Sequence, residues 1–312
     1  MKHRLLQQTR LIPQADTALR ERYDVHPLWE EADADAFLAR HGGEFAGLVT
    51  TSRLGASDAL MGKLPNLRVI SNFGVGLDAM DVAAARRRGI AVGYTPEVLN
   101  DCVADTAFAL LMDVSRGVSA ADRYVRRGEW LRAPYPLTHR VSGKRLGIFG
   151  LGRIGRVIAR RAQGFDMEIR YHNRRPAADL PYAYENSLID LARWADYLVI
   201  ASTGGAETRH IVSAEVLDAL GPQGFLINIS RGGNIDEAAL VRALQEKRIA
   251  GAGLDVFEQE PRVPEAFFAL DNVVLLPHVA SATHETRADM AQLVLDNLEA
   301  FFRTGAVKVS AL

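Results

Sequence analysis

The sequence predicts an α/β fold made of two doubly wound parallel-sheet domains. Three observations support this prediction. Short apolar runs alternate with amphipathic stretches along most of the chain, which is typical of a parallel sheet covered by helices on both faces. The length of 312 residues is enough for two domains that each bury a core. A glycine-rich segment also lies between a predicted strand and a predicted helix, which is typical of nucleotide-binding α/β domains.

The first part of the chain contains the first run of this alternation. Strands are expected over 46–52, 67–73 and 90–96, because these runs are apolar and are bounded by turn-forming residues. Helices are expected over 56–64 and 81–89, which are amphipathic. The basic residues that close the second of these helices suit the helix dipole, so we interpret them as a solvated helix end.

A long helix is predicted over 98–114, where Val103, Ala107 and Val114 recur at helical spacing. This helix is expected to leave the first domain and enter the second. The later segment 131–143 is polar and contains prolines, so we expect a connection there.

A second series of elements with short links fills the rest of the chain. The expected strands cover 144–150, 167–173, 196–202, 224–230, 250–257 and 272–278, and the expected helices cover 153–165, 188–195, 214–221 and 237–249. The last amphipathic stretch, 285–305, is a helix late enough to return to the first domain. We therefore predict a flavodoxin-like domain from 1–97 and 284–312, with the domain 98–283 inserted in it.

The composition is that of a soluble globular protein, with 48% apolar residues, 24% charged residues and a net charge of −1. This balance argues against a nucleic-acid partner and against a polybasic membrane segment. The apolar window around Cys102 is interrupted by Asp101, Asp105 and Asp113, so it is too short to span a membrane. Cys102 is the only cysteine, and the first ten residues lack the apolar core of a signal peptide. We expect a cytoplasmic protein.

The glycine-rich segment is GIFGLGRIG, in which Gly150, Gly152 and Gly155 have the spacing G-x-G-x-x-G. An apolar strand precedes it and an amphipathic helix follows, which is the context that the motif requires. Gly150 permits the tight turn, Gly152 lets backbone N–H groups approach a pyrophosphate, and Gly155 lets helix and strand pack closely. The inserted domain is therefore predicted to be a Rossmann nucleotide domain.

The next predicted strand ends in YHNRRP, which departs from an NAD pattern. An NAD site has Asp or Glu about 20 residues beyond the glycines to bind the ribose hydroxyls. His172 and Asn173 occupy that place, and Arg174 and Arg175 follow. Guanidinium groups pair with a 2′-phosphate, whereas a carboxylate repels it. NADP(H) is therefore the expected cofactor, with NADPH preferred over NADH.

Three polar side chains follow predicted strands of this domain, at the sheet edge where doubly wound folds bind their ligands. Each has an ordinary alternative: Arg231 could cap a turn, Glu260 could be a surface acid and His278 could be a packed core residue. Together they supply the groups that reduction of a 2-keto acid needs. Arg231 can bind the carboxylate and polarise the ketone. His278 can donate the proton as general acid, and Glu260 can keep the imidazole of His278 protonated and oriented.

With these residues in place, the chain resembles the D-isomer-specific 2-hydroxyacid dehydrogenases over nearly its whole length. The motifs NFGVGLD, TPEVLNDCVADTAFALLM, GIFGLGRIG, INISRGGNIDE, GAGLDVFEQEP and LLPHVAS occur in the family's order. Within the family the chain is similar to the NADPH-dependent branch of hydroxypyruvate, glyoxylate and hydroxyphenylpyruvate reductases. One departure is STGGAETRH, where Gly204 and Gly205 stand in a cofactor-side loop that usually contains proline in the family.

The resemblance implies catalytic roles for Arg231, Glu260 and His278, and a homodimer formed through the nucleotide domain. It also implies that Asp255 contacts the nicotinamide carboxamide. The expected cofactor contacts are Gly150, Leu151, Gly152, Arg153, Ile154, Gly155, Asn173, Arg174, Arg175, Ser202, Ile229, Arg231, Asp255, His278 and Ala280. The expected substrate contacts are Thr50 and Arg53 of one loop, the backbone N–H groups of Val75 and Gly76, and the side chains of Arg231 and His278.

Two classes of function fit this pattern. The first is an enzyme that reduces glyoxylate or hydroxypyruvate to the D-2-hydroxy acid with NADPH, with hydroxyphenylpyruvate as a bulkier alternative substrate. The second is a nucleotide-sensing binding protein, since corepressors related to this family keep the same three residues. The chain lacks the long terminal tails that such proteins tend to carry. No metal site is expected, because the eight histidines show no ligand spacing of the H-x-x-x-H kind.

Overall fold

The computed structural model of the chain describes residues 2–177 and 179–312. The chain divides into two compact units. The first unit consists of Met1–Leu99 and Ala282–Leu312, and the second unit consists of Asn100–Ser281. The second unit is thus inserted into the first.

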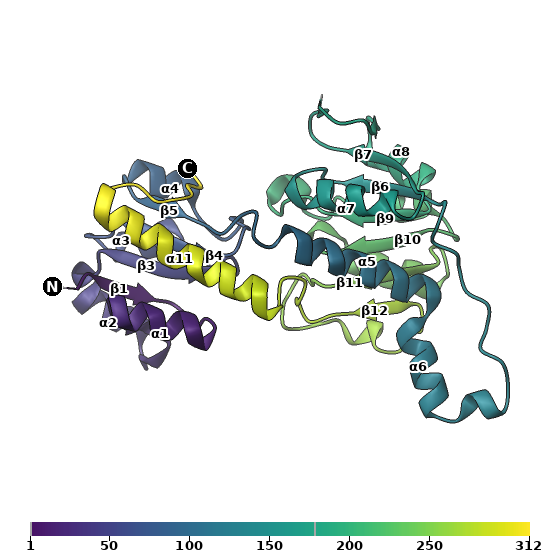
Figure 1. Ribbon diagram of the computed structural model, residues 1–312, viewed down its shortest axis with the longest axis horizontal. Helices are drawn as coiled ribbons and strands as arrows, with labels where there is room; N and C mark the ends of the chain where they lie inside the picture. The colour runs from purple at the N-terminus through teal and green to yellow at the C-terminus, as the bar shows by residue number, and fades with distance from the viewer. Residues whose placement is uncertain (1, 178) are drawn as a thin grey trace. The chain divides into compact units, whose positions relative to one another are not determined.

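The first unit contains a five-stranded sheet in the order β2-β1-β3-β4-β5, and every paired strand is parallel to its neighbour (Figure 1). This is the flavodoxin-like order. The strands are β1 (Arg4–Gln7), β2 (Asp24–Pro27), β3 (Gly47–Thr51), β4 (Val69–Phe73) and β5 (Ala91–Gly93). The central strands β3 and β4 are buried almost throughout, and they carry buried polar side chains such as Ser71 and Asn72 beside their apolar residues.

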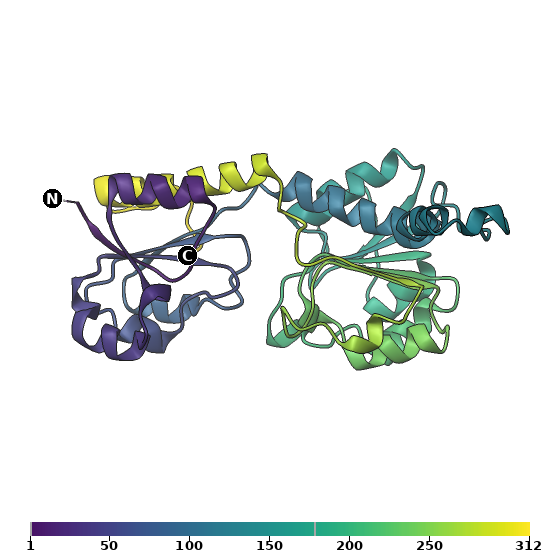
Figure 2. The ribbon, with the colours of Figure 1, turned by 90° about the horizontal axis from the view of Figure 1, so that it is seen from below.

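Helices cover both faces of this sheet (Figure 2). On one face lie α1 (Pro13–Arg22) and α11 (His284–Thr304), and on the other lie α2 (Ala34–His41), α3 (Asp58–Gly62) and α4 (Val82–Arg87). The last helix is tied to the sheet by buried polar groups: Ser71 Oγ donates to the carbonyl oxygen of Val294 at 3.1 Å, and Asn297 Nδ2 donates to that of Tyr94 at 3.1 Å. The C-terminal segment therefore completes the core of the N-terminal unit.

The second unit contains a seven-stranded parallel sheet in the order β12-β11-β10-β9-β6-β7-β8. The strands are β6 (Arg145–Phe149), β7 (Glu168–His172), β8 (Ala183–Tyr184), β9 (Tyr197–Ile200), β10 (Phe225–Asn228), β11 (Gly251–Leu254) and β12 (Val273–Leu275). The strand order reverses between β6 and β9, which is the Rossmann switch point, where ligands bind at the carboxyl ends of the strands.

Two layers of helices cover this second sheet (Figures 1 and 2). One layer holds α5 (Asn100–Arg116) and α7 (Arg153–Gln163), and the other holds α8 (Leu188–Trp194), α9 (Ala214–Leu220) and α10 (Glu237–Gln245). The helix α6 (Val118–Arg126) follows α5. Short 3-10 turns complete the fold: η1 (Leu28–Glu30), η2 (Gly42–Glu44), η3 (Glu129–Leu131), η4 (Ala206–Thr208), η5 (Gly232–Asn234) and η6 (Glu265–Phe267).

Side-chain caps and glycines explain where several of these elements lie. Ser187 and Asp236 cap α8 and α10 by accepting hydrogen bonds from backbone N–H groups of the first turn. Gly253 of β11 allows close approach of α5, since a Cβ there would lie 2.9 Å from Leu110 Cβ. Within the described part of the chain, no helix is both long and apolar enough to cross a membrane.

Each strand and helix that the sequence predicted by range overlaps an observed element of the same type. Other elements were not predicted individually: β1, α1, β2 and α2 before residue 46, the two-residue strand β8, and α6. The strand β2 has the sequence DVHP and is partly exposed at a sheet edge, so it has no apolar run that would reveal it.

Candidate active site

The glycine loop lies at the switch point of the second sheet. Gly150 directly follows β6 and has φ +100°, a conformation that favours glycine. A Cβ at this position would lie 2.4 Å from the backbone nitrogen of Ser202, at the end of β9. Gly150 is therefore required both by its backbone angle and by the close approach of two strand ends.

The other two glycines of the motif differ in their surroundings. Gly155 packs α7 against the loop, since a Cβ there would lie 2.3 Å from the carbonyl oxygen of Gly150. Gly152 precedes α7, and a Cβ added to it would meet no described atom within 4 Å, so the space beside its backbone is open. The first N–H groups of α7 lack partners within the helix, and they attract an anion. The loop thus fits a dinucleotide pyrophosphate.

The segment after β7 holds the predicted ribose-binding residues. The Asn173 side chain accepts a hydrogen bond from the backbone N–H of Leu151 at 2.7 Å, so it braces the glycine loop. Arg174 and Arg175 are exposed beyond it. The Arg174 guanidinium donates to Glu207 of η4 at 2.9 Å, and both side chains are about four-fifths exposed. Glu207 was not predicted as a partner of Arg174, because the pairing depends on the tertiary fold.

Arg231 lies shortly after β10, at the start of η5, and is half-buried. Its backbone carbonyl accepts a hydrogen bond from Asn228 Nδ2 at 2.9 Å, and its Nη1 donates to the carbonyl oxygen of Ser230 at 2.8 Å. The next residue, Gly232, contacts the turn after β11: a Cβ there would lie 1.9 Å from the carbonyl carbon of Phe257. The turns that carry Arg231 and Glu260 are therefore in direct backbone contact.

The structure pairs His278 with Glu260. Nδ1 of His278 and Oε2 of Glu260 are 2.8 Å apart, and the two side chains are 43% and 18% exposed. Because an ionised carboxylate only accepts hydrogen bonds, this pairing assigns the proton to Nδ1. The other Glu260 oxygen accepts from the N–H of Phe257 at 3.1 Å, which fixes the carboxylate. The imidazole is thus oriented through Nδ1, and Nε2 is the atom that can serve chemistry.

Asp255 holds the turn that carries His278. It is fully buried, and its two oxygens accept hydrogen bonds from the N–H groups of Val279 and Ala280 at 2.7 and 2.9 Å. Its carbonyl oxygen accepts from the N–H of His278, whose φ is +55°. Burial raises the pKa of Asp255, and the two backbone N–H groups oppose that rise. This carboxylate is part of the support for the histidine, and its contact with the nicotinamide carboxamide stays a prediction.

Two further acids, Glu237 and Glu258, lie close to the turn that carries Glu260. Glu237 of α10 accepts a hydrogen bond from the N–H of Glu258 at 2.8 Å, and Glu258 in turn pairs with Arg209 at 2.7 Å and His210 at 3.0 Å. Burial raises the pKa of Glu237, and the charges of Glu258 and Glu260 raise it further. These residues were not predicted, although the alternating acids of FEQEP are a visible signal in the sequence.

The predicted substrate loops of the first unit follow β3 and β4. Thr50 is fully buried and donates to the carbonyl oxygen of Gly55 at 2.9 Å, so its side chain shapes the turn. Arg53 is exposed, and Val75 and Gly76 are half-buried. The buried Asn72 connects the two loops, since its Nδ2 donates to Ser52 Oγ at 3.1 Å and lies 3.4 Å from the carbonyl oxygen of Gly76.

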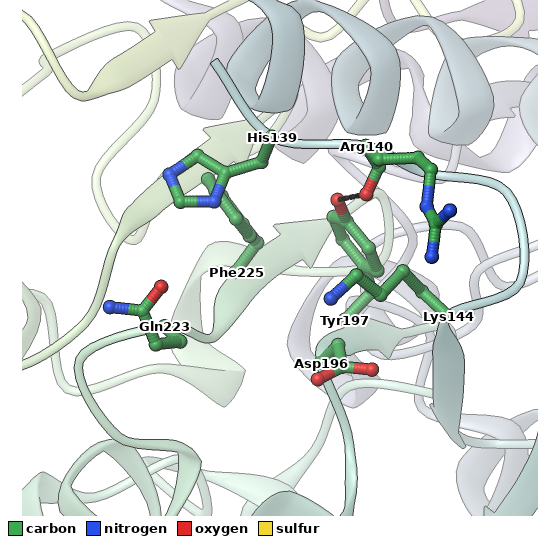
Figure 3. A pocket seen from close by; sticks show the side chains of 7 residues that line it. All are labelled: His139, Arg140, Lys144, Asp196, Tyr197, Gln223 and Phe225. Carbon is green, nitrogen blue, oxygen red and sulfur yellow. Dashed lines mark hydrogen bonds between the residues drawn. The ribbon is translucent and has the colours of Figure 1, made fainter. Parts of the chain in front are cut away.

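A small pocket lies at the amino ends of strands in the second sheet, opposite the carboxyl ends that carry the candidate site (Figure 3). Its lining residues stand at or near the amino ends of β6, β9 and β10: His139, Arg140, Lys144, Asp196, Tyr197, Gln223 and Phe225. Tyr197 donates to the carbonyl oxygen of Arg140 across it, at 3.3 Å. The volume of about 40 Å³ suits ordered water, and doubly wound sheets bind ligands at the carboxyl ends, so this pocket is not the active site.

The described residues contain no group of three or more His, Cys, Asp or Glu side chains suited to a metal ion. The candidate site brings together an oriented imidazole, a guanidinium and the glycine loop in one unit. The glycine loop follows β6 of the parallel sheet. Arg231, Glu260 and His278 follow the neighbouring strands β10, β11 and β12 of the same sheet. Such an arrangement can bind an anion, bind a dinucleotide and transfer a proton.

The chain is similar to known proteins of one enzyme family. The family model "D-isomer specific 2-hydroxyacid dehydrogenase, NAD binding domain" matches residues 108–280. Glyoxylate/hydroxypyruvate reductase A HPR2 of Arabidopsis thaliana is 46% identical over 287 residues, which cover 92% of each chain. Hydroxyphenylpyruvate reductase of Plectranthus scutellarioides is 48% identical over 284 residues, which cover 91% of each chain.

Solved structures of similar sequence have the same fold along the whole chain. The 2-hydroxyacid dehydrogenase of Ketogulonicigenium vulgare Y25 superposes with a TM-score of 0.94 at 44% identity and covers 100% of this chain and 99% of its own. The NADPH-dependent glyoxylate/hydroxypyruvate reductase of Sinorhizobium meliloti, in complex with NADP and malonate, superposes with a TM-score of 0.92 at 41% identity and covers 100% and 97%.

Proposed function

Because the chain belongs to the D-isomer-specific 2-hydroxyacid dehydrogenase family, we propose that it reduces a small 2-keto acid, glyoxylate or hydroxypyruvate, to the D-2-hydroxy acid with NADPH. The observation that carries the proposal is the 2.8 Å bond between His278 and Glu260, in the same unit as the glycine loop. A carboxylate-oriented imidazole is the arrangement that general acid–base catalysis needs.

The glycine loop and the residues after β7 would hold NADP(H), which would supply the hydride for the carbonyl carbon of the substrate. Arg231 binds the substrate carboxylate and polarises the ketone, since a guanidinium fork matches a carboxylate. In this step His278 acts as the imidazolium, with one proton on Nδ1 held by Glu260 and a second proton on Nε2. The Nε2 proton passes to the carbonyl oxygen as negative charge develops there, which leaves a neutral imidazole that Glu260 keeps aligned through Nδ1.

The preference for NADPH is supported by the residues after β7. Asn173 stands where an NAD site has an acid, and it accepts from the glycine loop. Arg174 and Arg175 then present two exposed cations that can pair with a 2′-phosphate. The Sinorhizobium meliloti reductase, a relative of the same fold, was solved with NADP.

Replacing Arg174 and Arg175 together by alanine is expected to raise the KM for NADPH about 10-fold or more, because charge-assisted hydrogen bonds to the phosphate are lost. The KM for NADH should change by less than about twofold, since NADH lacks that phosphate. Arg193→Ala is the control, because Arg193 is likewise exposed and pairs with an acid, Asp190, but lies on α8. Equal losses with both cofactors would contradict the assignment.

The substrate is tested by comparing kcat/KM for glyoxylate, hydroxypyruvate and hydroxyphenylpyruvate with each cofactor. We expect turnover with NADPH and the two small keto acids. Hydroxyphenylpyruvate is the second candidate, because a relative that is 48% identical is a hydroxyphenylpyruvate reductase. Tight NADPH binding without turnover of any of the three would instead support a nucleotide-sensing protein.

We further propose that the chain forms a homodimer through the second unit. Exposed apolar side chains gather in and after α6, notably Val125, Trp130, Leu131 and Leu137. Isolated exposed apolar residues are common, but this many along one connection indicate a covered surface. Sedimentation at the mass of a single chain would contradict the proposal.

We also propose that the protein works in the cytoplasm. The presence of a single cysteine is typical of a reducing compartment, and cell fractionation would test this location.

A further inference from the structure

The loop after β9 lies directly against the side chain of Arg231. A Cβ built on Gly204 would lie 2.7 Å from Arg231 Cγ, 3.3 Å from its Cβ and 3.7 Å from its Cδ. These are the first atoms of the arginine stem, so they cannot move aside as a flexible tip would. The absence of a side chain at Gly204 therefore provides the space in which the Arg231 stem lies.

A buried asparagine fixes both sides of this contact. Asn234 is 1% exposed, and its Nδ2 donates to Ser202 Oγ at 3.2 Å and to Ser230 Oγ at 3.1 Å. Ser202 lies in the loop that contains Gly204, and Ser230 directly precedes Arg231. The backbone N–H of Asn234 also donates to the carbonyl oxygen of Arg231 at 3.2 Å. The loop and the arginine turn are thus held together by one residue that water does not reach.

Because the loop is held, a side chain at Gly204 would displace the arginine rather than the loop. We propose that Gly204 is a positioning residue for the Arg231 guanidinium, so that the loop after β9 sets how tightly the enzyme binds the carboxylate of its substrate. This inference rests on the proposed function, in which Arg231 binds that carboxylate. In this role Gly204 acts through Arg231.

Gly204→Ala is expected to raise the KM for the 2-keto acid about 10- to 100-fold, because displacements of about 1 Å at a binding group have effects of this size. The dissociation constant of NADPH, measured by its fluorescence, should change by less than about twofold, and kcat should fall by less than KM rises. An equal loss of NADPH affinity would overturn the proposal, because the loop would then act on the cofactor.

Gly233→Ala is the matched control. Gly233 lies two residues from Arg231, but a Cβ there meets no described atom within 4 Å, and its φ is not in the left-handed region. The same methyl group should therefore leave the KM for the keto acid unchanged. If Gly204→Ala and Gly233→Ala behave alike in an active enzyme, the inference fails. An inactive wild-type enzyme would instead refute the proposed function.

A double-mutant cycle tests whether Gly204 acts through Arg231. Arg231→Ala removes Cγ and Cδ, so the added methyl group no longer has a stem to displace. Gly204→Ala should then cause no further loss of kcat/KM in the Arg231→Ala background, measured at raised enzyme concentration. If the two losses multiply instead, the methyl group acts elsewhere and the proposal is wrong.

Discussion

His278→Ala is expected to lower kcat about 10²- to 10⁴-fold, which is the usual contribution of a general acid. The variant removes the proton donor but none of the residues of the glycine loop, so the dissociation constant of NADPH should stay close to that of the wild type. Single-turnover rates and fluorescence titration with NADPH measure the two quantities separately. Near-normal turnover would contradict the catalytic assignment.

The chain offers a close control for this variant. His41, at the end of α2, is 42% exposed, and its Nδ1 lies 2.7 Å from Glu44 Oε1, so it forms the same kind of pair as His278 with Glu260. Its pair lies on the first unit, away from the strand ends that carry the proposed catalytic residues. His41→Ala should leave kcat unchanged, which would show that the loss at His278 comes from its place in the site.

Arg231→Ala is expected to lower kcat/KM for the keto acid about 10²- to 10³-fold. Truncating one partner of a hydrogen-bonded charge pair is costly, because the other charge is left without its partner. Arg231→Lys should recover only part of the loss, since an ammonium group keeps the charge but not the planar fork. Steady-state kinetics with glyoxylate or hydroxypyruvate measure these changes.

The control for Arg231 is Arg242→Ala. Arg242 is an exposed arginine on α10 of the same unit, away from the strand ends that carry the proposed catalytic residues. Its loss should leave kcat/KM unchanged. If Arg231→Ala raised the KM for NADPH while the KM for the keto acid stayed constant, Arg231 would serve the cofactor and not the substrate carboxylate.

The features that depend on local pattern could be predicted from the sequence. Buried parallel strands are continuous apolar runs, so β6, β9 and β10 were visible, and their ends located the candidate residues. Gly150 and Gly155 were predicted because a tight turn and close helix packing exclude any side chain. Arg231, Glu260 and His278 were predicted as candidates because each follows a predicted strand, and those three strands are neighbours in the sheet.

The remaining features depend on distances between segments that are far apart in the chain. Asn173 was predicted as a cofactor contact, but its bond to Leu151 depends on where β7 ends relative to the glycine loop. The contact of Gly204 with Arg231 has no pattern in the sequence, because it arises where the loop after β9 meets the turn after β10. The edge strand β2 was hidden because a polar, partly exposed segment has no apolar periodicity.

The return of α11 to the first unit has a consequence for synthesis on the ribosome. Residues 100–281 form the second unit without any other part of the chain, so this unit can fold as soon as it has emerged. Residues 1–99 of the first unit are made earlier, but their sheet lacks the helix α11 until residues 282–312 have been made. The order of folding is therefore expected to reverse the order of translation, and the apolar face that α11 covers stays open to chaperones for most of that time.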